Sequence, residues 1–112
     1  MINKELSAAT IRPAVLSILA NGDSYGYEIV KTVRERSNEA IEWEEGVLYP
    51  VLHRLEREGL LTSYWKKGET GRRRKYYSLN AAGHRELADS KNQWKAAASL
   101  LTGIWGGEPC LT

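Results

Sequence analysis

Six cations crowd into one ten-residue stretch of the chain, 66–75, in which Glu69 is the only acid. They are Lys66, Lys67, Arg72, Arg73, Arg74 and Lys75. Because the formal net charge of the whole chain is only +2, this concentration is a local feature rather than a consequence of composition. Cations at such density repel one another unless a polyanion lies beside them, and nucleic-acid phosphates supply that charge. The stretch predicts polyanion binding, with a merely solvated loop as the alternative.

A second group of polar side chains occurs at helical spacing just before this stretch. At about 100° per residue, a helix over residues 46–58 gathers its apolar side chains on one face. These are Leu48, Val51, Leu52 and Leu55. The opposite face carries Tyr49 and His53, which can hydrogen-bond base edges or phosphates, and Arg57, which can reach the DNA backbone. For Tyr49 and His53, a half-buried surface pair without a ligand is the alternative.

Two earlier helices must support these side chains. Thr10 can cap a first helix, with Pro13 in its first turn, where the missing N–H costs nothing. That helix is expected to end at residues 21–23. Ser24 is expected to cap a second helix that carries Tyr25 on its apolar side.

A β-hairpin is predicted next in the chain. Residues 60–67 and 75–79 are rich in Leu, Tyr, Trp, Ser and Thr, and a glycine-containing segment with the basic run joins them. The hairpin tip is therefore expected to carry the cations of residues 72–75. Three helices followed by a hairpin predict a mainly α fold with a small β-hairpin, the winged helix-turn-helix, with its third helix in the major groove of DNA.

The final segment, 80–105, has the pattern of one long helix capped by Asn80. At about 1.5 Å per residue it spans roughly 40 Å, too long for so small a domain to cover its apolar stripe. We therefore expect a homodimer that covers this stripe. The expected interface residues are Leu87, Trp94, Ala98, Leu101, Ile104 and Trp105. The expected domains are a winged helix over 1–79, a dimerisation helix over 80–106 and a flexible tail over 107–112.

Catalytic, metal and membrane functions are not indicated by the residues present. The single cysteine, Cys110, has only His53 and His84 as possible co-ligands, at no zinc-binding spacing. No nucleophile with an adjacent base, paired carboxylates or phosphate-cradling loop occurs, so we expect neither an enzyme nor a cofactor. Without a long apolar run or a leader sequence, a cytoplasmic protein that does not contact membranes is expected.

Five segments together resemble the PadR family of transcriptional regulators over residues 14–90. They are Tyr-Gly-Tyr-Glu-Ile at 25–29, residues 46–56 with Leu-Tyr-Pro at 48–50, residues 59–61, Arg-Lys-Tyr-Tyr at 74–77, and Gly83. The resemblance implies a winged-helix repressor that dimerises through its C-terminal helix, with Tyr49 and the basic positions 72–75 facing a pseudo-palindromic operator. Val47 replaces a threonine common in the family, and the short C-terminal portion indicates the compact subgroup.

The resemblance also implies an effector, because compact PadR members are associated with planar, hydrophobic ligands held between their C-terminal helices. Trp94 is the expected stacking platform, and the small side chains of Ala97 and Ala98 leave space for a flat molecule. Alternatively, Trp94 and Trp105 only pack the dimer core. The alternative to operator binding as a whole is a winged-helix protein-interaction module.

Overall fold

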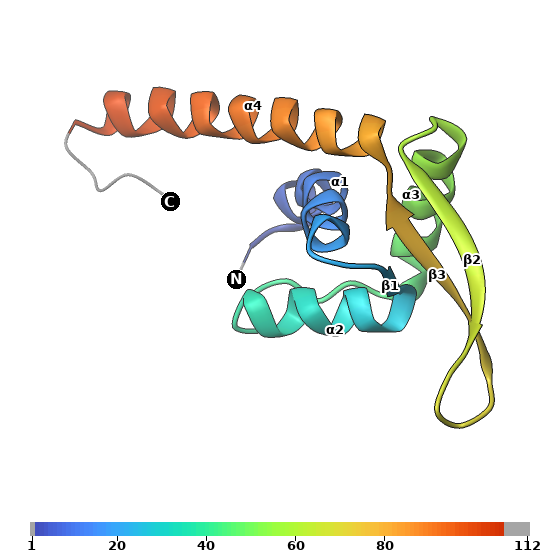
Figure 1. The fold of residues 1–112 in the computed structure, drawn as a ribbon. Coiled ribbons are helices and arrows are strands. Elements are labelled where there is room, and N and C mark those ends of the chain that lie inside the picture. Colours follow the sequence, from blue (N-terminus) through green and yellow to red (C-terminus); the bar gives the residue numbers. More distant parts are fainter. Residues whose placement is uncertain (1, 107–112) are drawn as a thin grey trace.

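A computed structural model of the chain describes residues 2–106. The elements in order are α1 (Lys4–Ala20), β1 (Ser24–Tyr25), α2 (Gly26–Arg36), α3 (Glu45–Arg57), β2 (Leu61–Lys67), β3 (Arg73–Leu79) and α4 (Ala81–Trp105). The first three helices cluster beside the sheet, and the β2–β3 hairpin projects past them. Helix α4 runs above α1 and extends away from the hairpin (Figure 1). The predicted fold, mainly helical with a small antiparallel sheet and a long C-terminal helix, is confirmed.

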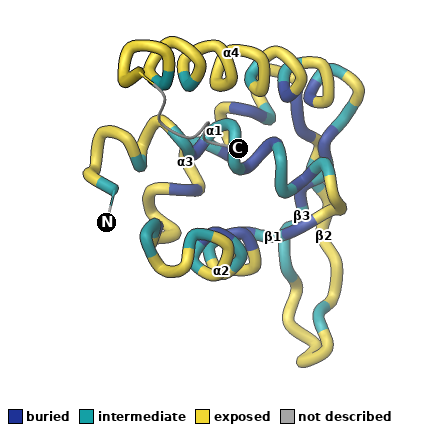
Figure 2. Tube along the Cα trace, turned by 90° about the vertical axis from the view of Figure 1, so that its left-hand side faces the viewer, coloured by how far each residue is buried: buried dark blue, intermediate teal, exposed yellow. Residues whose placement is uncertain are grey.

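The core lies where the three short helices meet the inner side of the sheet. Its fully buried side chains are Val15 and Leu16 of α1, Ile29 of α2, Leu48, Leu52 and Leu55 of α3, and Tyr77 of β3. Each large apolar side chain removed from water contributes about 1.5–3 kcal/mol, so this apolar face fixes the rotation of α3 about its axis. The opposite face of α3 is consequently presented to solvent, as its hydrophobic pattern predicts (Figure 2).

The first helix begins earlier than its sequence pattern predicts. The Asn3 side chain caps α1 by accepting a 2.9 Å hydrogen bond from the Leu6 N–H. Thr10, the predicted cap, lies inside the helix and donates its hydroxyl to the Ser7 carbonyl. Pro13 is also in the helix interior rather than the first turn. The prediction was wrong because the turns before Pro13 bury too few apolar side chains to show a helical period.

Ser24 is also not a helix cap. Ser24 and Tyr25 form the short strand β1, which pairs antiparallel with β3, so that Ser24 lies opposite Tyr77 and Tyr25 opposite Tyr76. The sheet therefore has three strands, in the order β1-β3-β2, where only a hairpin is predicted. A two-residue strand is too short for any alternation to indicate it.

The predicted hairpin tip is shorter than expected. Strands β2 and β3 stay paired out to Lys67 and Arg73, so only residues 68–72 form the turn. Gly71 adopts a φ of 83°, which glycine reaches without a Cβ clash. Arg73, Arg74 and Lys75 therefore belong to β3, and their side chains alternate between the two faces of the β2–β3 hairpin.

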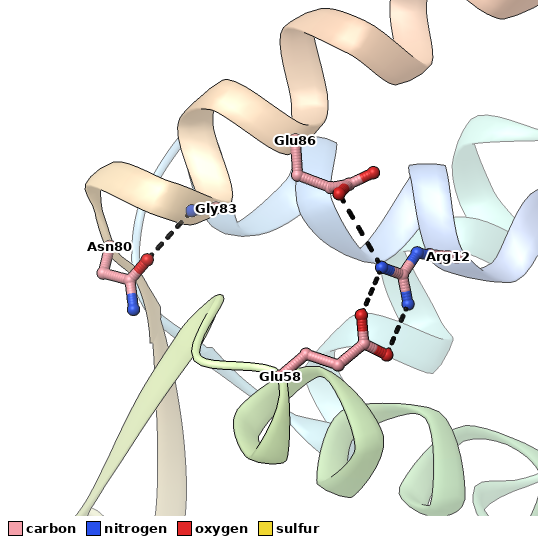
Figure 3. A network of polar contacts seen from close by, with 5 residues as sticks. All are labelled: Arg12, Glu58, Asn80, Gly83 and Glu86. Carbon is pink, nitrogen blue, oxygen red and sulfur yellow. Dashed lines mark hydrogen bonds and ion pairs between the residues drawn. The ribbon is translucent and has the colours of Figure 1, made fainter.

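Helix α4 is anchored at its start. The Asn80 side chain accepts a 2.9 Å hydrogen bond from the Gly83 N–H, which confirms Asn80 as the cap (Figure 3). It also donates to the Gly59 carbonyl at 2.7 Å. A Cβ at Gly83 would collide with Leu79 and with the Leu60 carbonyl, so glycine permits this close approach. Leu87 is buried in the core of the single chain.

Three charged side chains tie α4 to the rest of the domain. Arg12 of α1 donates to both carboxylate oxygens of Glu58, at 2.7 and 3.1 Å, and lies 3.9 Å from Glu86 of α4 (Figure 3). Glu58 is the C-cap of α3, where the helix dipole disfavours a negative charge. The guanidinium therefore offsets that cost while joining three helices.

The remainder of α4 packs against no buried core within residues 2–106. Gly83 and Leu87 are its only buried residues in the described part of the chain, and most of the helix beyond them is exposed (Figure 2). Five large apolar residues lie on this exposed part, namely Trp94, Leu100, Leu101, Ile104 and Trp105. Leu87, predicted at the dimer interface, is thus buried against the core of its own chain. The predicted tail, with Cys110, lies outside the described residues, and no described helix is long and apolar enough to span a membrane.

Candidate nucleic-acid interface

A cleft of about 580 Å³ separates the exposed face of α3 from the β2–β3 hairpin. One wall carries Tyr49 and His53, and the other carries Trp65 and the cations of residues 72–75. The sheet register fixes the second wall, because Trp65 lies directly opposite Lys75 across β2 and β3. Side chains from α3 and from the basic run, far apart in sequence, are thus brought to one concave surface.

Tyr49 is held at this surface by a glycine. Its ring lies against Gly26, the first residue of α2, so closely that a Cβ at Gly26 would come within 2.6 Å of the phenol oxygen. The side chain remains 37% exposed, and its ring centroid is 6.3 Å from that of His53. Partial burial, with the Glu45 carboxylate nearby, raises the pKa of the Tyr49 phenol. The hydroxyl therefore stays a hydrogen-bond donor at neutral pH.

The cations of the β2–β3 hairpin, which we call the wing, differ in how far neighbouring side chains neutralise or cover their charge. Lys75 lies 3.7 Å from Glu56 of α3, which partly neutralises it. Arg73 lies over the Trp65 ring at 5.3 Å and remains exposed, as does Arg72. Arg74 is half-buried against Tyr25. Arg72 and Arg73 are the residues of the basic run with the most accessible charge in the cleft.

Three of the predicted contact residues do not line this cleft. Arg57 is the last residue of α3 and lies beyond its far end. Lys66 and Lys67 line a separate hollow of about 420 Å³ that also includes Arg74 and Tyr76. The predicted site is therefore divided between two surfaces of the wing.

Two aromatic residues in the cleft have no place in the sequence prediction. Tyr27, in the first turn of α2, and Trp65, in β2, are 59% and 58% exposed. The signal for Trp65 is the hairpin register, which places it directly opposite Lys75 of β3. The signal for Tyr27 is the helical period of α2, which places it about 200° from the buried Ile29.

The floor of the cleft is the buried Tyr77. Its hydroxyl has no hydrogen-bond partner within residues 2–106. Burial, with the Glu56 carboxylate nearby, raises the pKa of the Tyr77 phenol to about 12. The residue therefore remains neutral below that pH. In the same range no group of three or more His, Cys, Asp or Glu side chains is placed to hold a metal ion.

The structure combines three helices with a two-stranded wing, and the polar face of α3 and the cationic wing border one cleft. These features define a winged-helix domain of the DNA-binding class. Residues 15–89 match the family described as "Transcriptional regulator PadR-like family". The chain belongs to this family of transcriptional regulators, whose members act by binding DNA, and the predicted resemblance is confirmed.

Relatives of known sequence and structure agree with this assignment. The chain is 30% identical to the transcriptional regulator Rv3488 of Mycobacterium tuberculosis, over 94% of this chain and 92% of that protein. A transcriptional regulator from Clostridium thermocellum superposes with a TM-score of 0.83 at 31% identity, covering 92% of this chain and 97% of the other. A PadR family regulator from Eggerthella lenta gives 0.79 at 34% identity, covering 93% and 88%.

Proposed function

We propose that this chain is a homodimeric, sequence-specific repressor whose operator binding responds to a small planar hydrophobic ligand. Tyr49 and His53 meet base edges or phosphates in the major groove. Arg57 and the wing cations Lys66, Lys67, Arg72, Arg73, Arg74 and Lys75 meet the DNA backbone. Repression follows when the bound dimer covers promoter sequence.

The observation that carries this proposal is the shared cleft. Base readout needs a helix face with hydrogen-bonding side chains, and backbone contact needs fixed cations at its flank. Tyr49 and His53 on α3 and Arg72 and Arg73 on the wing provide both on one concave surface. The Arg73 guanidinium lies 5.3 Å from the centre of the Trp65 ring in this cleft, an ordered contact that a merely solvated loop does not require.

The proposed dimer rests on the unsupported half of α4. Trp94, Ala98, Leu101 and Trp105 share one face at about 100° per residue, and Ile104 lies at its edge. Exposed apolar patches of this kind mark interaction surfaces in soluble domains. A second copy related by a two-fold axis supplies a matching stripe and brings a second α3 for the other half-site.

The proposed effector site uses the same face. Trp94 is 40% exposed and Ala97 is exposed, so an indole surface lies beside a position without bulk. Between two copies of α4, a planar hydrophobic molecule can stack on Trp94 and occupy the space beside Ala97 and Ala98. Adding such a ligand shifts operator affinity if the ligand changes the angle between the two helices.

The test is a fluorescence-anisotropy titration against the region upstream of the protein's own gene, at about 50 and about 200 mM salt. The unmodified chain is compared with the double variant Arg72→Ala, Arg73→Ala. A matched control, Arg36→Ala with Arg85→Ala, removes two exposed arginines on α2 and α4, away from the cleft. We expect affinity to fall steeply with salt, because counterions leave the DNA phosphates on binding.

The wing variant should bind about tenfold or more weakly, with a smaller salt dependence, while the control binds like the unmodified chain. Equal, weak binding by all three proteins to every duplex would instead favour the protein-interaction module. Repeating the titration with a planar dye and with Trp94→Ala tests the effector separately from DNA binding.

A further inference from the structure

Among residues 2–106, Glu45 is the only acidic side chain that lines the cleft between α3 and the wing. The lining also includes the four cations of residues 72–75. Glu45 is exposed, and within the described chain its carboxylate makes no ion pair with any of them. A surface that binds DNA phosphates would gain affinity without this negative charge. Phosphate binding alone therefore gives no reason for Glu45 at this position.

Glu45 is the first residue of α3 and shares a stripe with the proposed base contacts. Tyr49 and His53 follow it at intervals of four residues, a spacing that makes side chains neighbours on one face of an α-helix. All three line the same cleft. Partial burial raises the pKa of the Tyr49 phenol, and the charge of the nearby Glu45 carboxylate adds to that rise. The stripe that faces the DNA thus begins with a hydrogen-bond acceptor.

The position of Glu45 at the start of α3 favours contact with bases. In helix-turn-helix proteins, the N-terminal residues of the recognition helix contact base edges in the major groove. The buried leucines of α3 fix its rotation, so the stripe that starts at Glu45 stays turned toward the cleft. Glu45 and Tyr49 are about 6 Å apart along the helix axis, close to the rise of two base pairs. The two side chains can therefore contact different base pairs.

The chemistry of a carboxylate limits the bases that Glu45 can bind. A carboxylate only accepts hydrogen bonds, and the donors in the major groove are the amino groups of cytosine and adenine. Guanine presents two acceptors there, and thymine presents an acceptor and a methyl group. In adenine the N7 acceptor lies beside the amino group and repels a carboxylate, whereas cytosine has a C–H at that place. Cytosine is therefore the base that suits Glu45 best.

The charge of Glu45 also penalises other sequences. Opposite guanine or thymine the carboxylate meets only acceptors, so it loses water without gaining a partner, which is unfavourable. The phosphates that border the groove repel it at every sequence. Recognition surfaces commonly obtain specificity by penalising the wrong partner. Glu45 thus weakens binding to most sequences and weakens it least where a cytosine lies opposite.

We propose that Glu45 is a specificity-determining residue that accepts a hydrogen bond from the amino group of one cytosine in each half-site of the operator. This inference rests on the proposed function and adds to it the base contacted at the N-terminus of α3. The cations of the wing supply affinity for any duplex, and Glu45 selects among duplexes.

The test is the selection of duplexes from a pool with randomised base pairs, followed by sequencing of the bound fraction. The unmodified chain is compared with Glu45→Ala and Glu45→Gln. The matched control is Glu44→Ala, which removes one negative charge from the same end of α3. Glu44 is the exposed N-cap residue, makes no side-chain capping hydrogen bond and does not line the cleft.

We expect the unmodified chain to enrich cytosine at one position of each half-site, roughly tenfold over the other bases. Glu45→Ala should lose this preference alone and should bind random-sequence duplexes more tightly in an anisotropy titration, because the repulsion is gone. Glu45→Gln should change the preference to adenine, since a side-chain amide can donate to N7 and accept from the N6 amino group. Glu44→Ala should keep the cytosine preference.

Base preferences at the other positions serve as the folding control, because a misfolded variant would lose them all. The proposal is overturned if Glu45→Ala keeps every preference of the unmodified chain, or if it weakens all positions alike. A residue that only stabilises the helix end through its dipole would change the melting temperature and no base preference. Loss of the cytosine preference in Glu44→Ala would equally overturn the proposal. If the unmodified chain enriches no sequence at all, the proposed function itself is rejected.

Discussion

Gly26 and Tyr49 illustrate how a single missing side chain positions a contact residue. Gly26 has helical backbone geometry as the first residue of α2, so alanine is favoured there by about 0.5–1 kcal/mol in intrinsic propensity. A methyl group at this position would, however, meet the Tyr49 hydroxyl at 2.6 Å. Because the Tyr49 side chain is 37% exposed, its ring can turn toward solvent to avoid this contact.

The first prediction is that Gly26→Ala leaves the melting temperature unchanged or slightly raised and weakens operator binding about tenfold, because Tyr49 is displaced. Thermal unfolding and anisotropy titrations measure the two effects. Gly46→Ala is the matched stability control, since it lies in the first turn of α3 with nothing within 4 Å of its Cβ position. If operator affinity is unchanged in Gly26→Ala, the placement of Tyr49 is irrelevant to binding.

Tyr77 provides a second prediction at the residue scale. Its buried hydroxyl has no partner within the described chain, and leaving such a group unsatisfied costs about 1–3 kcal/mol. Tyr77→Phe should therefore raise the free energy of unfolding at pH 7 by about 1 kcal/mol. Urea unfolding measures this, and a destabilised Phe variant would indicate that a water molecule satisfies the hydroxyl.

The pH dependence of that variant gives an independent check. The folded-state pKa of Tyr77, about 12, is above the ordinary value of 10, so the unfolded chain ionises first as pH rises. Its contribution to stability is fully present below pH 10 and is lost between pH 10 and 12. Tyr77→Phe should lose less stability than the unmodified chain across this window.

At the scale of elements, Arg12 and Glu58 join α1 to the end of α3. The Arg12 hydrogen bond lowers the pKa of the Glu58 carboxyl below its usual value of 4.5. A depressed carboxyl pKa contributes stability that is present above the unfolded value and lost as pH falls through the folded value. Both side chains are more than a third exposed, so solvent screening keeps the contribution below about 1 kcal/mol.

The third prediction is that Arg12→Gln lowers the melting temperature slightly at pH 7 and that this loss shrinks as the pH falls through the lowered pKa of Glu58. Thermal unfolding between pH 7 and 3 measures the difference. Arg34→Gln is the matched control, because its 3.8 Å pair with Glu42 joins α2 only to the loop that follows it. An equal loss at both pH values would show that Arg12 acts through packing of its methylene groups.

The elements with a strong period or a clear cap are the ones that sequence analysis predicts well. Leu48, Leu52 and Leu55 fix α3 within one residue at each end, and Asn80 marks the start of α4. The strand β1 leaves no signal, because its two residues form a strand only through pairing with β3. Which cations of residues 66–75 belong to the strands and which to the turn depends on the register of β2 and β3. That register depends on where the turn begins and not on residue type.

At the scale of the whole molecule, the first half of α4 packs against the rest of the domain, whereas its second half is exposed. Its 25 residues measure about 37 Å at 1.5 Å per residue, and burial within the described chain stops at Leu87. The Asn80 cap, the Gly83 contact and the proximity of Arg12 to Glu86 fix the direction of the first half. The exposed second half therefore projects at a defined angle, which in a two-fold dimer sets the separation of the two α3 helices.

The fourth prediction follows from this division. Leu101→Glu with Ile104→Glu places two charges on the proposed interface, where burying unpaired charges is strongly unfavourable. Neither residue is buried in the single chain, at 43% and 70% exposed, so the domain should stay folded while the dimer dissociates. Sedimentation should then show monomers, and affinity for a two-half-site duplex should fall at least about a hundredfold with a smaller salt slope, because one α3 and one wing remain bound.

Ala96→Glu, on the opposite side of α4, is the matched control and should remain dimeric. A variant that remains dimeric would place the interface elsewhere on the chain, and a monomer with undiminished affinity would show that one copy reads the whole operator.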